Sequence, residues 1–231
     1  MKLDKSKENI SAMFDDIADR YDFLNHTFTA NLDKVWRRKI INYISLNKIK
    51  ATQIIDLASG TGDMAVELLK LEPQKIYSFD ISPKMLELQR KKISNEKVVI
   101  QLADSENMPV ESGSIDIVTI SFGIRNFESI EKSLKEIYRV LKPDGMLIVL
   151  EMFSLEKRNP LFEFYFTKIM PVFGRIISRS NTAYAYLHTS VMNFKTVKEF
   201  VEIASNNGFV LEYRKNNFRK FVYSVYLRKF I

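Results

Sequence analysis

The sequence has no cysteine and only two histidines in 231 residues. Disulfides and cysteine-bound metals are therefore excluded, which is consistent with a reducing compartment. The scarcity of histidine argues against a histidine-rich metal site, so we expect no metal. Long apolar runs are also lacking. The most apolar stretch, residues 161–177, is interrupted by Glu163, Lys168, Arg175, Pro171 and Gly174, whereas a membrane-spanning helix needs about 20 mostly apolar residues.

The N-terminal segment MKLDKSKENISAMF lacks the apolar segment of a signal peptide, so we expect a cytoplasmic protein. The chain is 46% hydrophobic and 27% charged, which is ordinary for one globular domain with a sizeable core. Its formal net charge is +7. A lysine-rich solvated surface explains this charge, although a basic face could also attract nucleic acid or anionic lipid. The basic and aromatic C-terminus, YRKNNFRKFVYSVYLRKFI, is interpreted as a solvated edge strand.

The apolar pattern predicts two helices within residues 1–50 and an alternation of strands and helices from Thr52. Strands are expected at 53–58, 75–81, 97–104, 114–121 and 146–153, and helices at 63–71, 83–94 and 129–141. Short apolar strands separated by helices predict a parallel sheet covered on both faces. A ligand would then lie beyond the carboxyl ends of the strands.

Residues 159–207 interrupt this alternation and predict an aromatic helical insertion, which ends in an amphipathic helix before Gly208. We therefore expect a single domain, residues 1–231. It would consist of an N-terminal helical cap (1–50), a cofactor-binding core (52–153), an insertion on the substrate side (159–207) and closing strands (208–231).

The stretch IIDLASGTGDMA places Gly60, Gly62 and Ala65 in a G-x-G-x-x-A pattern after a strand. This pattern is shared by proteins that bind NAD, FAD or S-adenosylmethionine, and a tight turn without a ligand can also produce it. Asp80 follows Gly60 by twenty residues at the end of the second strand, the position of a carboxylate that accepts from both ribose hydroxyls. The pattern therefore indicates a nucleotide.

Charges around the glycine loop discriminate between these cofactors. Asp56 precedes the loop and Asp63 begins the following helix, where a diphosphate would need an electropositive helix N-terminus. Two carboxylates disfavour a diphosphate and suit the ammonium and sulfonium of S-adenosylmethionine, although Asp63 could simply cap the helix. Further along, Asp104 could accept from the adenine amino group, Ser105 could donate its backbone N–H to the ring, and Ser121 ends the fourth strand over the cleft.

This ordered set of strand ends resembles a class I S-adenosylmethionine-dependent methyltransferase, as does RVLKPDG before the fifth strand. Flanking motifs resemble the ubiquinone/menaquinone biosynthesis C-methyltransferases over roughly residues 11 to 210. These motifs are MFDDIADRYDFLNHTFTANLDKVWRR, DLASGTGD, ISFGIRNF, YRVLKPDG, LIVLEMF, IMPVFGRIIS and AYAYLHTSVMNF. The resemblance implies an α/β fold with a Rossmann-like seven-stranded sheet, and C-methylation of a polyprenylated quinol.

The resemblance also implies roles for individual residues. Thr61, Asp80, Asp104, Ser105 and Ser121 would contact the cofactor. Asp56, Gly60 and Gly62 complete the expected cofactor site, and Arg125, Asn126 and Tyr21 form the expected catalytic set. Several positions depart from the family pattern, namely Ser59 and Asp144 for glycine, Lys195 for proline, Thr189 for glutamate, and a C-terminus without H-x-G-x-K.

Methyl transfer is a displacement at a sulfonium carbon, so positioning can supply much of the acceleration. We expect Arg125 to stabilise the developing phenolate, unless it is paired structurally with Asp22 or Glu151. Asn126 would orient the ring, and Tyr21 would close over the methionine end of the cofactor, unless it is a core aromatic.

No residue is a clear general base. His188 is interpreted as a packing residue, and His26 as a cap or surface residue. The aromatic insertion could line a prenyl tunnel, contact a bilayer or form ordinary core.

The preferred function is methylation of demethylmenaquinol to menaquinol, with peripheral contact of the protein with an anionic membrane at the inner face of the cell membrane. The alternatives are the equivalent benzoquinol of the ubiquinone pathway and another small-molecule acceptor. An RNA methyltransferase is less favoured because no RNA-binding module is recognisable, so no nucleic-acid partner is expected. An NAD(P)-dependent oxidoreductase and a non-enzymatic cofactor-binding protein complete the alternatives. The sequence does not indicate an oligomeric state.

Overall fold

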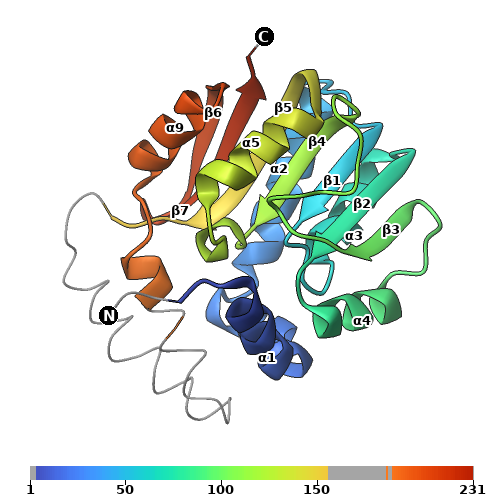
Figure 1. The fold of residues 1–231 in the computed structure, drawn as a ribbon, viewed down its shortest axis with the longest axis vertical. Coiled ribbons are helices and arrows are strands. Elements are labelled where there is room, and N and C mark those ends of the chain that lie inside the picture. The colour runs from blue at the N-terminus through green and yellow to red at the C-terminus, as the bar shows by residue number, and fades with distance from the viewer. Residues whose placement is uncertain (1–3, 156–185, 187–188, 231) are drawn as a thin grey trace.

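A computed structural model describes residues 4–155, 186 and 189–230, so the expected aromatic stretch 161–177 lies outside the described residues. Within the described part, seven strands form one sheet in the order β3-β2-β1-β4-β5-β7-β6 (Figure 1). The strands are β1 Gln53–Leu57, β2 Lys75–Asp80, β3 Val98–Leu102, β4 Ile115–Ser121, β5 Leu141–Met152, β6 Phe209–Phe218 and β7 Val222–Lys229. Strands β1 to β5 pair in parallel, and β7 pairs antiparallel with β5 and β6. The predicted Rossmann-like seven-stranded sheet is confirmed. The C-terminal stretch expected to be one solvated edge strand instead forms part of β6, at the edge, and all of β7, which is largely buried between β5 and β6.

Helices cover both faces of the sheet, as the apolar strands require. They are α1 Lys7–Phe28, α2 Leu32–Leu46, α3 Asp63–Leu68, α4 Pro83–Lys92, α5 Ile130–Val140 and α9 Val197–Asn206, with 3₁₀ turns η1 Leu69–Leu71 and η2 Ile124–Asn126. Helices α5 and α9 contribute to the core on one face, and α2 and α3 to the core on the other. Figure 1 shows α5 in front of the sheet and α2 behind it.

Local sequence explains where several helices begin. Ser82 caps α4 by accepting from the backbone N–H of Met85 at 3.1 Å, and proline occupies the first turn. Ser129 caps α5 in the same way. Thr196 and Glu199 form a capping box at α9, which stabilises the start of the predicted amphipathic helix.

The turn between β1 and α3 requires glycine. Gly62 has a φ of +88°, and a Cβ there would lie 2.7 Å from Cγ of Gln89, so a side chain is excluded on two grounds. Ser59 is not among the residues with a left-handed φ, so serine is tolerated at this departure from the family pattern. Asp144 has a φ of +60° at an irregularity in β5, as expected of a turn residue that replaces glycine.

Helix α1 lies across the carboxyl ends of the parallel strands and beside α4 (Figure 1). Asp15 of α1 accepts from the hydroxyl of Ser82 at 2.5 Å and thereby attaches α1 to the start of α4. The ligand site expected at this edge of the sheet is therefore covered by the N-terminal helix. None of the helices in the described ranges is long and apolar enough to span a membrane.

Candidate active site

A cavity lies at the carboxyl edge of the sheet, beneath α1, and encloses about 710 Å³ of empty volume, part of it open to solvent. Its lining includes seven residues singled out from the sequence: Tyr21, Gly60, Asp80, Asp104, Ser105, Ser121 and Asn126. The fold thus brings together groups that lie more than a hundred residues apart in the chain.

Asp80 is held at the floor of this cavity by backbone donors. Its Oδ2 accepts from the N–H of Gly60 and its Oδ1 from the N–H of Ser82, each at 2.8 Å. Burial raises the pKa of Asp80, and these N–H donors act in the opposite direction. Each carboxylate oxygen has a further lone pair, so Asp80 can accept from two adjacent hydroxyl groups.

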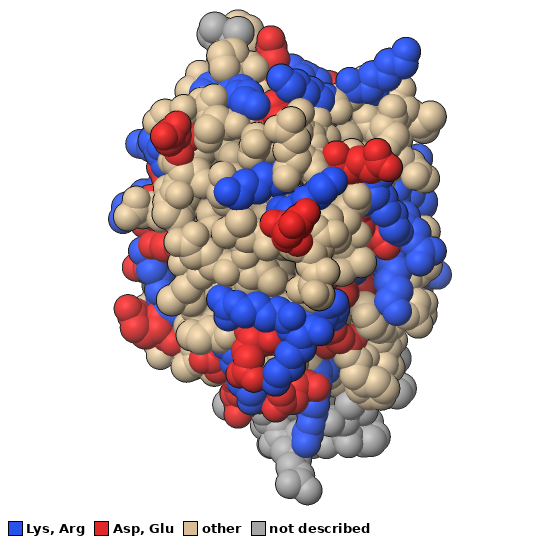
Figure 2. All heavy atoms as spheres, turned by 90° about the vertical axis from the view of Figure 1, so that its right-hand side faces the viewer, with Lys and Arg blue, Asp and Glu red and all other residues tan. Residues whose placement is uncertain are grey.

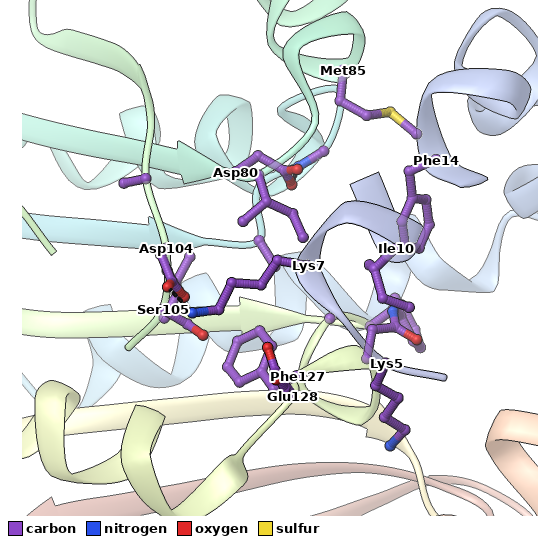
Figure 3. A pocket seen from close by; sticks show the side chains of 18 of the residues that line it. Lys5, Lys7, Ile10, Phe14, Asp80, Met85, Asp104, Ser105, Phe127 and Glu128 are labelled. Carbon is purple, nitrogen blue, oxygen red and sulfur yellow. Dashed lines mark hydrogen bonds and ion pairs between the residues drawn. The ribbon is translucent and has the colours of Figure 1, made fainter. Parts of the chain in front are cut away.

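Lysines from the N-terminal segment also enter this cavity. Figure 3 shows Lys7 reaching from α1 toward Asp104, with which it forms an ion pair. Lys5 donates from Nζ to the carbonyl oxygen of Arg125 at 2.6 Å. Burial lowers the pKa of Lys5, and the guanidinium of Arg125 lowers it further. Sequence reasoning missed both lysines because a lysine in a polar segment follows no recognisable pattern.

Two serines at strand ends differ in their partners. The hydroxyl of Ser105 lies 2.8 Å from the hydroxyl of Ser133. The Oγ of Ser121 is buried and has no hydrogen-bond partner among the described residues, although its residue lines the cavity. An orphaned hydroxyl in a cavity that Asp80 and Asp104 also line fits a polar ligand such as a nucleoside.

Three predicted cofactor residues, Asp56, Thr61 and Gly62, do not line this cavity. Asp56 is fully buried on β1, where burial raises its pKa to about 7, and its Oδ1 accepts from Thr119 at 3.1 Å. Thr61 donates its hydroxyl to Asp22. Gly62 is instead the N-cap residue of α3.

The carboxylate expected at the start of α3 is neutralised within the protein. Asp63 pairs with Nζ of Lys92 at 2.9 Å and lies 3.6 Å from Nη1 of Arg37. Gly62 occupies the N-cap, and no side-chain capping bond is present, so Asp63 is not the cap. Asp56 is buried behind the loop and Asp63 is already paired, so neither carboxylate lines this cavity, and their expected attraction for a cationic ligand stays a prediction.

A second cavity, with about 840 Å³ of empty volume, adjoins the first. Both are lined by Phe14, Tyr21 and Phe122. The second is mostly apolar, with Met13, Ile17, Leu24, Phe28 and Met152 in its lining. Its polar lining residues are Asn25, Thr29, Asp33, Arg37, Arg125 and Tyr186.

Arg125 is paired with a buried carboxylate, as the structural alternative predicted. Its Nη1 donates to Oε1 of Glu151 at 2.7 Å and to the carbonyl oxygen of Phe122 at 2.7 Å. The other predicted partner, Asp22, is bound by Thr61 and Lys92 instead. Burial raises the pKa of Glu151, against the charge of Arg125. The guanidinium is thereby fixed, while its Nε has no hydrogen-bond partner within the part of the chain that the structure describes.

Asn126 and Tyr186 connect the two cavities. The hydroxyl of Tyr186 donates to Oδ1 of Asn126 at 3.0 Å. Burial raises the pKa of Tyr186 to about 12, so the hydroxyl keeps its proton and remains a donor. The amide NH₂ of Asn126 is therefore left as a donor for other groups.

The structure tests the prediction for one of the two histidines. His26 is neither a cap nor a free surface residue: its Nδ1 lies 2.9 Å from Oδ2 of Asp33, and its Nε2 lies 3.6 Å from Oδ2 of Asp63. That prediction was wrong because the turn after α1 brings α2 back beside the last turn of α1. His188 lies outside the described residues.

Comparisons with known proteins agree with this geometry. The model of the ubiE/COQ5 methyltransferase family matches residues 1–223. The chain belongs to the ubiE/COQ5 methyltransferase family. It is 36% identical over 212 residues to a demethylmenaquinone methyltransferase from Bacteroides fragilis, covering 89% of this chain and 86% of that protein. It is 39% identical over 216 residues to a ubiquinone/menaquinone biosynthesis C-methyltransferase UbiE from Geotalea uraniireducens, covering 90% and 91%.

The fold of this ubiE/COQ5 family member is shared with solved methyltransferases. A SAM-dependent methyltransferase from Aquifex aeolicus superposes with a TM-score of 0.61 at 16% identity, covering 84% of this chain and 89% of that one. The protein is thus a methyltransferase with a Rossmann-like fold, and S-adenosylmethionine is its methyl donor.

Proposed function

We propose that this enzyme methylates a ring carbon of a polyprenylated quinol, most specifically demethylmenaquinol to give menaquinol. The relatives named above support this substrate class. The observation that carries the proposal is the pair of adjoining cavities with Phe14, Tyr21 and Phe122 in common. One cavity has the polar groups for a nucleoside, and the other has the apolar lining for an aromatic acceptor. Adjacent sites are what direct methyl transfer requires.

In the first cavity, Gly60, Asp80, Asp104, Ser105 and Ser121 are the proposed contacts of S-adenosylmethionine. Bound there, S-adenosylmethionine supplies an electrophilic methyl group. Asp80 accepts hydrogen bonds from the ribose, and Ser121 gives its orphaned hydroxyl a partner.

The conformation of the glycine loop is fixed by Asp56, Thr61 and Gly62, which do not line the cavity. The ring of Tyr21 lies close to Gly60, because a Cβ on this glycine would be 3.8 Å from Cε1 of Tyr21. Tyr21 therefore closes the cofactor site from α1.

In the second cavity, Arg125 is the proposed electrostatic catalyst. A quinol oxygen that loses its proton increases the electron density at the neighbouring ring carbon. A fixed guanidinium beside this oxygen stabilises the negative charge as it develops. Glu151 positions Arg125, and Tyr186 holds Asn126 so that its NH₂ can orient the ring. Bound water removes the protons, since none of the described side chains is an evident base.

We also propose a domain organisation in which residues 1–50 cap the two cavities, 52–153 form the cofactor-binding core, 159–207 form the substrate side and 208–231 close the sheet. The enzyme works in the cytoplasm, in peripheral contact with the inner face of the cell membrane, where a polyprenylated acceptor resides.

The deciding experiment uses labelled S-adenosylmethionine with short-chain demethylmenaquinol and the matching benzoquinol, each kept reduced. Label transfer to the naphthoquinol alone supports the proposal. Transfer to both would make the enzyme active in both pathways, a broader specificity consistent with the UbiE name of some relatives. Transfer to neither, while calorimetry shows cofactor binding, would refute the quinol acceptor.

A further inference from the structure

One face of the protein combines exposed cations with exposed apolar side chains. Helix α2 and the β6–β7 hairpin form this face, because Tyr43 stacks on Tyr213 at 5.2 Å and Trp36 lies 6.4 Å from Phe218 between ring centroids. We call it the basic face, and it comprises the exposed cations Lys34, Arg38, Lys39, Lys215, Arg219 and Lys220 with the exposed apolar residues Leu32, Val35, Tyr213 and Phe218.

Acidic residues do not balance these cations. Within α2 and the hairpin the only acids are Asp33 and Glu212. Asp33 is buried and bound to Arg37, and Glu212 is bound to Arg228. Among the described residues, only Arg38 of these cations forms an ion pair with an acid of another element, at 3.6 Å from Glu67. Figure 2 shows a different pattern on the face at the right-hand side of Figure 1, where acidic and basic side chains interleave in the lower part.

The basic face adjoins the proposed acceptor cavity. The ring of Trp36 lies 6.2 Å from that of Phe122, which lines the cavity, and 6.4 Å from that of Phe218 on the basic face. In the sheet, Met152 of the cavity lining pairs with Val222, next to the hairpin turn. A surface that docked here would thus be close to the cavity in which the ring is to be methylated.

We propose that the basic face docks the enzyme on an anionic lipid bilayer, with Arg219 and Lys220 at the hairpin tip and Lys34 and Lys39 on α2 contacting headgroups. Leu32, Val35 and Phe218 enter the interfacial region between them. Lysine and arginine interspersed with exposed apolar side chains are typical of interfacial membrane binding. The choice of lipid over another polyanion rests on the proposed function, because a polyprenylated acceptor resides in a bilayer.

The test compares the binding of purified protein to vesicles of phosphatidylcholine with and without an equal part of phosphatidylglycerol, at low and high salt. We expect binding to the anionic vesicles alone and weakening by salt. Arg219→Gln with Lys220→Gln should weaken binding about 30-fold, which corresponds to about 1 kcal/mol for each cation near the surface. Lys34→Gln with Lys39→Gln should have a similar effect from a second element.

The matched control is Lys97→Gln with Lys135→Gln, which removes the same charge from exposed positions outside the basic face. This control should bind like wild type. Equal losses in all three variants would overturn the proposal, as would an absence of vesicle binding or a preference for RNA over lipid. Label transfer to a short-chain quinol in solution tests the proposed function separately from membrane docking. It should survive in the hairpin variant, and its absence in wild type would refute the proposed function but not the basic face.

Discussion

The pair of Arg125 and Glu151 allows stability and catalysis to be separated. Glu151 is 0% exposed and Arg125 is 7% exposed. Replacing Glu151 by Met leaves a buried guanidinium without its counter-charge. Removing one partner of a buried ion pair costs about 3–5 kcal/mol, which is a large share of a typical free energy of unfolding of about 5–15 kcal/mol. In a domain of this size about 3 kcal/mol corresponds to a fall of roughly 6–12 °C in Tm.

The double variant Arg125→Met with Glu151→Met removes both charges, and replacing a buried pair by apolar side chains is often neutral for stability. We therefore expect Tm to return close to wild type while methyl transfer does not recover. Losing one electrostatic contact to a developing anion costs about 10²–10³ in kcat. Thermal unfolding and label transfer are measured on the same samples. A double variant with wild-type kcat would refute the role of Arg125 in catalysis. A single variant as stable as wild type would refute the importance of the pair for folding.

Three further predictions concern the first cavity and its floor. Burial raises the pKa of Asp56 from 3.8 to about 7, so the folded protein holds this proton more tightly than the unfolded chain does. The resulting stabilisation is fully present below pH 3.8 and is lost as pH rises through 7. The gain in unfolding free energy from Asp56→Asn should therefore grow between pH 4 and pH 7, at about 1.4 kcal/mol per pH unit at most, and a pH-independent difference in denaturant titrations would contradict this. Lys7→Gln frees Asp104 from its ion pair, and since a solvent-accessible pair is worth about 0.2–1 kcal/mol, calorimetry should show S-adenosylhomocysteine binding up to about fivefold tighter. Weaker binding would mean that Lys7 itself contacts the ligand. Tyr21→Ala removes the ring beside Gly60, and the loss of a buried aromatic contact of about 1.5–3 kcal/mol should raise the Kd for the same ligand more than tenfold, whereas Tyr21→Phe should change it little. Unchanged affinity in both variants would remove Tyr21 from the site.

Regular patterns made the sheet and most of the helices predictable. The apolar strands and the glycine loop are local signals, and each led to an element at the expected position. Asp80, Asp104 and Ser121 were also predictable, because residues at the ends of parallel strands meet at one edge of the sheet.

The partners of charged side chains were not predictable from local signals. The neutralisation of Asp63 depends on Arg37 from α2 and Lys92 from α4. Likewise, the contact of Lys7 with Asp104 depends on how α1 crosses the strand ends. Such pairings follow from tertiary packing, and neither helical spacing nor a motif encodes them. The hydrogen bond from Tyr186 to Asn126 joins residues sixty positions apart and likewise follows from tertiary packing.

Helix α1 forms part of both cavities, because Phe14 and Tyr21 line each of them. Two ligands are thermodynamically coupled when both change the order of one element that they contact, and the coupling is reciprocal. If the cofactor orders α1 and thereby tightens acceptor binding by some factor, the acceptor must tighten cofactor binding by the same factor. Under that condition, each substrate would help to retain the other until transfer.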